Sequence, residues 1–423
     1  MKSKEEILQQ IEDEDIEFIR LQFVDMFGNL KNLAVTPGQL DRVINNEYFF
    51  DSSALFDDKY PHEEELYLHP DLDSFVVLPW RPQQGRVGKF ICDVYDADGN
   101  PHALSPRTIL KKTLKEGKEA GYKSIVDAEC EFFLFHTDEN GTPTVVTHER
   151  AGYMDVGPAD LGENARREMV LNLEEMGFEI ESSHHEKAPA QHEIDFREAE
   201  GLKTADAITT FKFAVRSIAK RFGLYATFMP KPRADVAGSG MHLNFQLYKD
   251  GENIFEKEDA KEARYFIGGI LKYAKDMCAI TNPTVNSYKR IISGFEAPNK
   301  IYWSTKGENA LVKLRKCFGE NKVELRFPDP SANPYLALAL CVAAGMRGMK
   351  EHICPDELLA SMGEQYLPEN LKEALDIMNE SKFVREVLGD EFVDIYVGIK
   401  QQEWKEYMLE VSDWEINKYL VKL

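Results

Sequence analysis

Three carboxylates and three imidazoles lie within the thirteen residues from Glu181 to Glu193. Pro189, inside this stretch, cannot continue a helix or a central strand, so the pattern predicts a strand, a turn and a second strand. Apolar residues flank the stretch at strand-like spacing, which indicates that Glu186 and Glu193 lie at the mouth of a sheet and direct oxygen ligands toward one place. A solvated loop is the more common location for any single glutamate, so a site requires further residues with matching chemistry.

Two other segments supply such residues. The apolar, β-prone run 124–135 predicts a buried strand with Glu129 and Glu131 on the same face, where two carboxylates need cations. The segment 241–247 alternates between an apolar face and a polar face. The polar face consists of His242, Asn244 and Gln246. Because oxygen ligands with a single imidazole suit Mg²⁺ or Mn²⁺ better than zinc, these segments predict a site for such divalent ions.

The composition limits the class of protein. Of the 423 residues, 43% are hydrophobic and 29% charged, which is typical of a folded globular chain long enough for two domains. The formal net charge of −22 argues against binding to nucleic acid or to an anionic membrane, because both need a basic face. The six cysteines show no CxxC pairing, so we expect reduced thiols in a cytoplasm. The sequence predicts neither a signal peptide nor a membrane span, since no window approaches about 18 apolar residues.

The first part of the chain is predicted to be rich in strands. Turn residues at 25–29 separate two apolar segments and indicate a hairpin. A turn at 96–101 suggests a domain boundary near residue 102, after which Ser105 and Pro106 begin a helix that Gly121 ends. We expect helices at 4–12 and 37–46, a loop at 49–53, and strands at 16–24, 30–35, 75–78 and 87–95.

The rest of the chain mixes helices with strands. Helices are expected at 163–176, 205–222, 259–280, 333–352 and 394–410. The sequence shows no internal repeat, no strict βαβ alternation, and neither a GxGxxG nor a Walker sequence. A small strand-rich domain followed by a larger mixed domain indicates an α+β fold. Any nucleotide must then be held through metal ions.

Five strings of residues carry a resemblance to a known family. They begin at His184 (HHEKAPAQHE), Ala226 (ATFMPKP), Gly238 (GSGMH), Asn282 (NPTVNSYKR) and Arg326 (RFPDPSANPY). Together they closely resemble the type I glutamine synthetase family of bacteria and archaea, from about residue 16 to residue 419. The resemblance implies a β-grasp domain over 1–102, and a catalytic domain over 103–423 with a curved antiparallel sheet, surrounding helices and a C-terminal helical tail. It also implies a dodecamer of two hexameric rings with active sites shared between neighbours.

The family joins glutamate to ammonia in two steps. ATP phosphorylates the γ-carboxylate, and ammonia then displaces phosphate from γ-glutamyl phosphate, while divalent ions neutralise the charge on the phosphate oxygens. By resemblance, one Mg²⁺ or Mn²⁺ ion is expected on Glu131, Glu186 and Glu193. A second ion is expected on Glu129, His242 and Glu324. Glu324 enters through the resemblance alone.

The same resemblance assigns the substrate residues. Asp51 matches the aspartate that binds and deprotonates ammonium from the neighbouring subunit, and Glu296 matches a flap glutamate that accepts a proton. With Arg326, which resembles an arginine that binds acyl-phosphate oxygens, they are the expected catalytic residues. The expected substrate-binding residues are Arg290, Arg326, Gly238, Tyr153 and Ser53. The expected ATP contacts are Asn244, Gln246, Lys313 and Lys322.

Several positions depart from the family pattern. Glu308 replaces an arginine and reverses the charge beside a polyphosphate, unless Lys306 takes over the phosphate contact or Glu308 faces a cationic amine. Lys313 and Lys322 replace arginines, which preserves the charge but loses the bidentate fork. Ser52, Ala237 and Asn244 replace a glycine, an asparagine and a histidine respectively. The segment after residue 353 lacks the stretch with a regulatory tyrosine, so nucleotidylation is not expected.

Three functions follow from these patterns. The first is an ATP-dependent carbon–nitrogen ligase that makes glutamine. The second is a γ-glutamyl ligase for an amine other than ammonia, which the changes at Ser52 and Ala237 would favour by reshaping the pockets. The third is a catalytically impaired homologue with a binding or regulatory role, disfavoured because intact metal-site residues would be an electrostatic cost in a scaffold.

Overall fold

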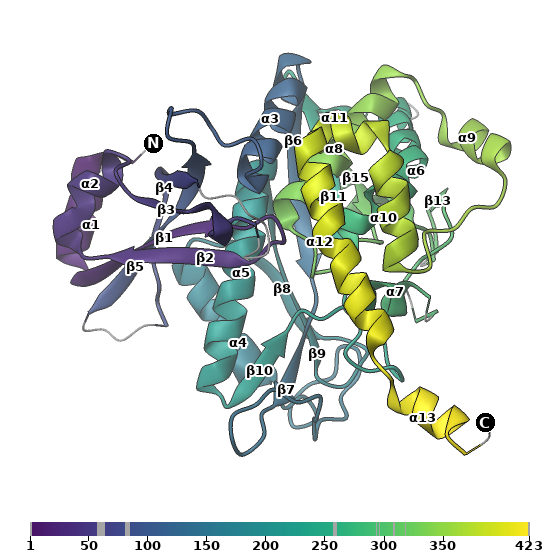
Figure 1. Ribbon diagram of the computed structural model, residues 1–423, viewed down its shortest axis with the longest axis horizontal. Helices are drawn as coiled ribbons and strands as arrows, with labels where there is room; N and C mark the ends of the chain where they lie inside the picture. Colours follow the sequence, from purple (N-terminus) through teal and green to yellow (C-terminus); the bar gives the residue numbers. More distant parts are fainter. Residues whose placement is uncertain are drawn as a thin grey trace.

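The computed structural model describes residues 2–56, 64–80, 85–256, 260–292, 294–295, 297–307, 309–317 and 319–421. Two sheets organise these residues (Figure 1). The smaller sheet has five strands in the order β2-β1-β5-β4-β3, in which only β1 and β5 are parallel neighbours. Its strands are β1 (Ile16–Val24), β2 (Leu30–Val35), β3 (Phe49–Asp51), β4 (Glu65–Val77) and β5 (Arg86–Tyr95).

The smaller sheet confirms the predicted hairpin and corrects two other predictions. β1 and β2 pair antiparallel around the turn at 25–29. The loop predicted at 49–53 is wrong, because residues 49–51 pair with residues 65–67 as the edge strand β3. The strand predicted at 75–78 is only the end of β4. Pro70 and its acidic neighbours hid the first half, and an irregularity in the register between Asp71 and Val76 accommodates them.

The larger sheet has ten strands in the order β10-β7-β9-β6-β11-β15-β14-β13, with β8 paired to β9 and β12 to β11. All of these pairs are antiparallel except β13–β14. The strands are β6 (Lys123–Cys130), β7 (Phe132–His136), β8 (Ile180–His185), β9 (Gln191–Glu200), β10 (Leu224–Thr227), β11 (Met241–Lys249), β12 (Glu252–Asn253), β13 (Trp303–Ser304), β14 (Val312–Cys317) and β15 (Glu320–Leu325). The single strand predicted at 124–135 divides at Glu131 into β6 and β7.

Two helices, α1 (Lys4–Asp13) and α2 (Leu40–Ile44), lie beside the smaller sheet, and the others lie on the side of the larger sheet (Figure 1). The others are α3 (Pro106–Glu119), α4 (Glu163–Glu175), α5 (Gly201–Arg221), α6 (Lys261–Thr281), α7 (Val285–Ile291), α8 (Pro334–Lys350), α9 (Pro355–Met362), α10 (Leu371–Glu380), α11 (Lys382–Leu388), α12 (Asp390–Leu409) and α13 (Asp413–Tyr419). The predicted α+β class, with a curved, largely antiparallel sheet surrounded by helices, is confirmed. None of the helices in the described ranges is both long and apolar enough to cross a membrane.

Helix α8 is the buried centre of the helical layer. It packs against α3, α5, α6 and α11. The contact with α6 is so close that a Cβ on Gly269 would lie 2.0 Å from the carbonyl oxygen of Ala344, and one on Gly348 would lie 2.2 Å from that of Tyr265. Only glycine permits this approach. The tight packing fixes the helices that support the strands of the larger sheet.

A buried arginine joins the smaller sheet to two helices that pack against the larger sheet. Arg107 on α3 contacts Asp71 on β4 at 2.7 Å, Asp93 on β5 at 2.6 Å and Asp206 on α5 at 2.9 Å. Its side chain is only 5% exposed, so it is a desolvated cation that depends on its carboxylate partners. The smaller sheet is therefore fixed relative to the larger one by charge as well as by packing.

Arg107→Ala is expected to lower stability by roughly 3 kcal/mol, because the change leaves three carboxylates without their shared partner. Thermal unfolding followed by circular dichroism should show a melting temperature lower by several degrees. Lys115→Ala is the matched control, since Lys115 lies on the same helix in an exposed pair with Glu119. Equal melting temperatures for the two variants would contradict the role assigned to Arg107.

Candidate active site

The strand register brings the predicted ligands of one ion together. Asn244 on β11 lies opposite Asp127 on β6 and opposite Glu324 on β15. Two residues earlier on β11, His242 lies opposite Glu129. Because alternate side chains share a face of a strand, all five point to the same side of the sheet. The apolar face of 241–247 is fully buried on the other side, which confirms the predicted alternation.

Glu129, His242 and Glu324 form a compact cluster. One ligand atom from each lies within 4.8 Å of the others, and His242 Nδ1 is 2.9 Å from Glu129 Oε2 and 3.7 Å from Glu324 Oε1. Burial alone would raise the pKa of Glu129, but the hydrogen bond and charge of His242 help to hold it below its usual range. Glu324 Oε2 is buried without a hydrogen-bond partner among the described residues. Two carboxylates, an imidazole and this orphaned oxygen fit a divalent cation.

Glu131 lies beside this cluster, at the break between β6 and β7. Its Oε2 accepts hydrogen bonds from Gln191 Nε2 at 2.7 Å and from the Gly240 amide at 3.0 Å. Gln191 Nε2 also donates to the carbonyl oxygen of Gly238 at 3.1 Å, where a Cβ would lie 2.2 Å from Pro230 O. Position 238 therefore has to be glycine, and the side chain of Gln191 connects its carbonyl oxygen to Glu131.

Glu186 and Glu193 lie on the hairpin of β8 and β9, in the strand–turn–strand arrangement predicted for this stretch. Glu186 Oε1 is 3.4 Å from His184 Nδ1. Ligand atoms of Glu193, His184 and Asp195 lie within 4.8 Å of one another. Burial, together with the charges of Asp195 and Glu131, raises the pKa of Glu193. The sequence argument identified both glutamates but missed Asp195.

The charge state of Glu131 should make cation binding depend on pH. Burial, with a contribution from Glu186, raises the pKa of Glu131 to about 7, so the cation-free carboxyl is protonated below that pH. A cation binds the ionised form, so binding should release a proton below pH 7 and should tighten by up to about tenfold per pH unit as the pH rises toward 7. Calorimetric titration of Mg²⁺ at pH 6, in two buffers of different ionisation enthalpy, measures this release. An affinity that is constant from pH 5.5 to 7 would contradict the prediction.

The two predicted arginines have different environments. Arg290 on α7 is buried and donates hydrogen bonds to the carbonyl oxygens of Arg326, Phe327 and Pro328. Arg326 follows β15, and its Nε lies 3.4 Å from Glu324 Oε1. The Nε and Nη1 atoms of Arg326 are buried and have no hydrogen-bond partner among the described residues. Arg290 thus holds the backbone of this segment, whereas Arg326 presents donors beside the acidic cluster.

The predicted ATP contacts lie along β11, β14 and β15. Lys313 Nζ is 4.0 Å from Glu324 Oε2. Lys322 Nζ is held by Asp127 at 2.6 Å and by Glu198 at 3.0 Å. The amide of Asn244 donates to Glu129 at 2.9 Å and also to Asp127. Gln246, farther along β11, donates to Glu320. Lys313, Asn244 and Lys322 are therefore connected to the acidic cluster through carboxylates.

The remaining predicted residues divide into two groups. Tyr153 lies at the site, with its ring 5.6 Å from that of His184 in an edge-on contact. Asp51 and Ser53 lie instead on the edge of the smaller sheet, where the exposed Asp51 accepts a hydrogen bond from the Ser53 amide at 2.9 Å. Glu296 and Glu308 lie outside the described residues.

Two further residues of the site were missed by the sequence argument. Asp127 faces the cluster from two positions before Glu129, and Arg315 does so from two positions after Lys313. Arg315 donates to Glu129 Oε1 and, at 3.2 Å, to Asn244 Oδ1. The spacing of two along a strand is the signal that could have found both, had the strands around them been paired correctly.

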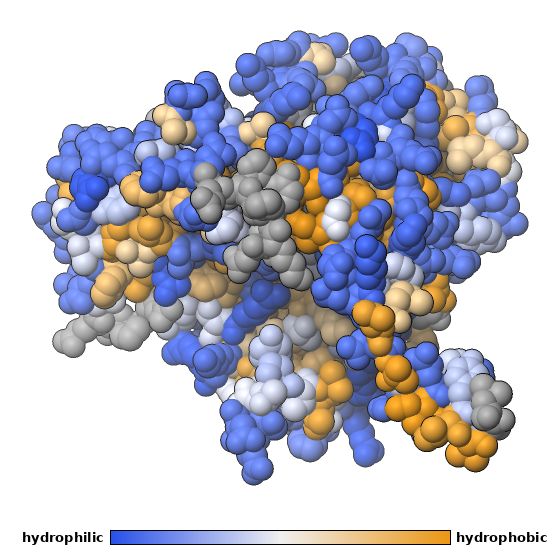
Figure 2. All heavy atoms as spheres, viewed as in Figure 1, coloured by the Kyte–Doolittle hydropathy of each residue, from blue (hydrophilic) through white to orange (hydrophobic). Residues whose placement is uncertain are grey.

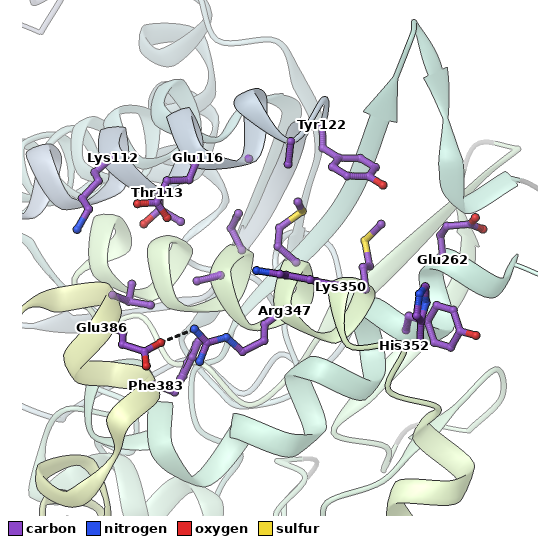
Figure 3. A pocket seen from close by; sticks show the side chains of 18 of the residues that line it. Lys112, Thr113, Glu116, Tyr122, Glu262, Arg347, Lys350, His352, Phe383 and Glu386 are labelled. Atoms are coloured by element: carbon purple, nitrogen blue, oxygen red, sulfur yellow. Dashed lines mark hydrogen bonds and ion pairs between the residues drawn. The ribbon is translucent and has the colours of Figure 1, made fainter.

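A cavity lies away from these residues. Figure 3 shows a cavity of about 770 Å³ between α3, α6, α8 and α11. Arg347 and Glu386 form an ion pair across it, and Lys112, Thr113 and Glu116 face it from α3. None of the predicted site residues is among the described residues that line it. The chemistry therefore belongs to the polar face of the larger sheet.

Two family models match the chain. "Glutamine synthetase, beta-Grasp domain" matches residues 15–97, and "Glutamine synthetase, catalytic domain" matches residues 103–419. The chain belongs to the glutamine synthetase family. This confirms the resemblance found in the sequence, and it identifies the five-stranded sheet as a β-grasp domain and the ten-stranded sheet as that of a glutamine synthetase catalytic domain.

Full-length relatives support the same assignment. A glutamine synthetase of Clostridium saccharobutylicum is 49% identical over 99% of this chain and 99% of its own, and one of Methanosarcina mazei is 43% identical over 100% and 98%. Among solved structures, a GmaS/ADP complex has a TM-score of 0.88 at 29% identity and covers 98% of this chain and 99% of its own. A Plasmodium falciparum glutamine synthetase, at 23% identity over 99% of each chain, has the same fold with a TM-score of 0.88.

Proposed function

We propose that the chain is an ATP-dependent ligase that forms glutamine from glutamate and ammonia through γ-glutamyl phosphate. The observation that carries this function is the cluster of Glu129, His242 and Glu324 beside the unpartnered donors of Arg326. The cluster can bind divalent cations, and Arg326 beside it can bind an anion. This arrangement suits phosphoryl transfer, in which positioning and electrostatics supply the catalysis. The full-length relatives named glutamine synthetase favour ammonia over another amine and favour an active enzyme over an impaired one.

Divalent ions are expected at two places on the sheet. Glu129, His242 and Glu324 would hold one Mg²⁺ or Mn²⁺, and Glu131, Glu186 and Glu193 would hold the other. When bound, such ions neutralise negative charge on the phosphate oxygens. Gln191 and the Gly240 amide orient Glu131, and the hydrogen bond between His242 and Glu129 fixes that imidazole.

The substrate contacts are proposed from the same geometry. Arg326 would bind the γ-carboxylate and then the acyl phosphate, because its Nε and Nη1 atoms have no hydrogen-bond partner among the described residues. Tyr153 and Gly238 would line the glutamate site near Glu186 and Glu131. Arg290 would add positive charge behind them. Lys313, Lys322, Asn244 and Gln246 would face the nucleotide, in line with the ADP named for the structural neighbour.

A shared active site is proposed for the assembled protein. Asp51 and Ser53 lie on an exposed edge of the β-grasp domain, so they would serve the site of a neighbouring chain, where Asp51 would bind ammonium and Glu296 would accept a proton. We propose residues 1–102 and 103–423 as the two domains, a dodecamer of two hexameric rings, and a cytoplasmic location.

The C-terminal tail supports an assembly of this kind. Figure 2 shows an apolar strip along the segment that leaves the body of the chain. Leu409 is 82% exposed, Trp414 60% and Leu420 76%. Such a strip on a monomer would be unfavourable in water, so a second copy is its natural cover. Multi-angle light scattering should give a mass near twelve chains, and a monomer under native conditions would remove the shared-site proposal.

A phosphate-release assay tests the function. With glutamate, ATP and Mg²⁺, we expect release that depends on ammonium and that matches glutamine measured by chromatography. A panel of primary amines in place of ammonium tests the alternative ligase. Phosphate release with none of these acceptors would reject both enzymatic functions, and release with an alkylamine but not with ammonium would reject glutamine as the product.

A further inference from the structure

Arg315 occupies an unexpected place in the site. It lies on β14, on the same face as Lys313, and its guanidinium reaches across β15 to the cluster on β11 and β6. Nη2 donates to Glu129 Oε1 and to Asn244 Oδ1, and Nε lies 3.4 Å from Glu324 Oε2. A side-chain cation thus contacts two of the three residues that would hold a divalent ion.

A guanidinium and a divalent ion would compete for the negative charge of these two carboxylates. Arg315 contacts Glu129 Oε1 and faces Glu324 Oε2, whereas His242 Nδ1 lies next to the other oxygen of each carboxylate. A cation beside His242 and the guanidinium of Arg315 would therefore draw on the same two carboxylates from opposite sides. Two like charges at contact distance repel strongly in a partly buried site. We therefore expect a cation on Glu129, His242 and Glu324 to weaken the contact between Glu129 and Arg315. Its side chain is 34% exposed, so it has room to move.

We propose that Arg315 is a phosphate-binding arginine that is held on Glu129 until a divalent cation displaces it, and that it then contacts the phosphate of the nucleotide. This inference rests on the proposed use of a nucleotide and a divalent ion. Arg315 would bind the nucleotide phosphate in place of Lys313 and Lys322, which lack a guanidinium fork because lysines have replaced arginines there.

Three observations favour a phosphate as the second partner. Lys322 would face the nucleotide, but Asp127 and Glu198 already hold its ammonium group, so it would act on the phosphates at a distance and leave direct contact to another residue. Arg315 Nε faces Glu324 Oε2 at 3.4 Å but has no hydrogen-bond partner among the described residues, so once Arg315 leaves the carboxylates this donor can bind an anion. Lys313 projects from the same face of β14, so Lys313 and Arg315 place two positive charges next to the carboxylates of Glu129 and Glu324. A cation would bind the acidic residues, and the phosphate that accompanies it would bind the basic residues beside them. A guanidinium fork matches phosphate oxygens.

The experiment measures binding without turnover. Electron paramagnetic resonance counts free Mn²⁺, and calorimetry measures the affinity for ADP with and without saturating Mn²⁺, in the full-length parent, Arg315→Gln and Arg315→Lys. For Arg315→Gln, we expect Mn²⁺ alone to bind about tenfold tighter at one class of site, because the competing cation is gone. ADP in saturating Mn²⁺ should bind about tenfold more weakly, a loss of about 1.4 kcal/mol. Arg315→Lys, which keeps the charge without the fork, should fall between the two.

Arg197→Gln is the matched control, because it removes a guanidinium from an exposed ion pair on the same sheet and should change neither affinity. If Arg315→Gln keeps the parent's affinity for ADP in Mn²⁺, or binds Mn²⁺ no tighter, the displacement is refuted and Arg315 is only a structural ion pair. If the parent itself binds neither Mn²⁺ nor ADP, the proposed function fails and takes this inference with it. Should Arg315→Gln not fold, the same two comparisons with Arg315→Lys decide the question.

Discussion

Glu324→Ala is expected to lower glutamine formation by at least about a thousandfold while the chain still folds and assembles. Glu324 is buried, its Oε2 has no hydrogen-bond partner among the described residues, and Arg315 and Arg326 lie no closer than 3.4 Å, so its carboxylate is available to a cation. Without it, only Glu129 and His242 remain to hold that ion. Loss of several kcal/mol of electrostatic stabilisation in phosphoryl transfer corresponds to a rate lower by three or more powers of ten.

The measurement is turnover at saturating ATP, glutamate and ammonium, combined with thermal unfolding with and without Mg²⁺. The parent should be stabilised by Mg²⁺, and Glu324→Ala should lose part of that stabilisation because one of the two proposed cation sites is damaged. Glu131→Ala should behave in the same way through the other ion. Glu179→Ala, which removes an exposed glutamate paired with Arg197, is the control. Turnover of Glu324→Ala within tenfold of the parent would show that this residue binds no essential cation.

Local patterns predicted the parts of the fold that are stabilised locally. Segment 241–247 alternates because β11 has one face in the core and one at the site, and the alternation is visible without knowledge of its partners. The helix from Pro106 was predicted because a proline at the first helical position and a glycine after the last turn limit it from within. The helices α7, α9, α10, α11 and α13 were missed, although α9 has the same signals, with Pro355 at its start and Gly363 after its end.

The pairing of strands could not be predicted from the residues alone. β11 lies between β6 and β15, which are distant from each other in the sequence, and neither neighbour can be identified from local patterns. This pairing is what places Glu324 opposite Asn244, and it explains why Glu324 entered only through the family resemblance. Arg315 was missed for the same reason, because it reaches the cluster only through the pairing of β14 with β15.

Pairing also explains where the predicted roles of charged residues need refinement. Lys322 was predicted as an ATP contact because it stands where the family pattern has an arginine shortly before Glu324. The structure adds that Asp127 and Glu198 bind its ammonium group. Burial alone would lower the pKa of Lys322, but these two carboxylates raise it above its usual range. No pattern along the sequence predicts that a carboxylate on β6 meets a lysine on β15. Such partners are a property of the assembled sheet.

Arg326→Lys is expected to lower kcat/KM for glutamate by about a hundredfold to a thousandfold without loss of stability. A lysine keeps the charge but has no planar fork for a carboxylate or an acyl phosphate, and removal of one positioned donor costs a comparable factor in other oxyanion sites. Stability should be unchanged because Nε and Nη1 of Arg326 have no hydrogen-bond partner among the described residues. Arg290→Lys provides the contrast, since it removes donors that hold three backbone carbonyls and should lower the melting temperature. If Arg326→Lys instead lowers the melting temperature and leaves the kinetics intact, Arg326 is a structural residue and another group must bind the acyl phosphate.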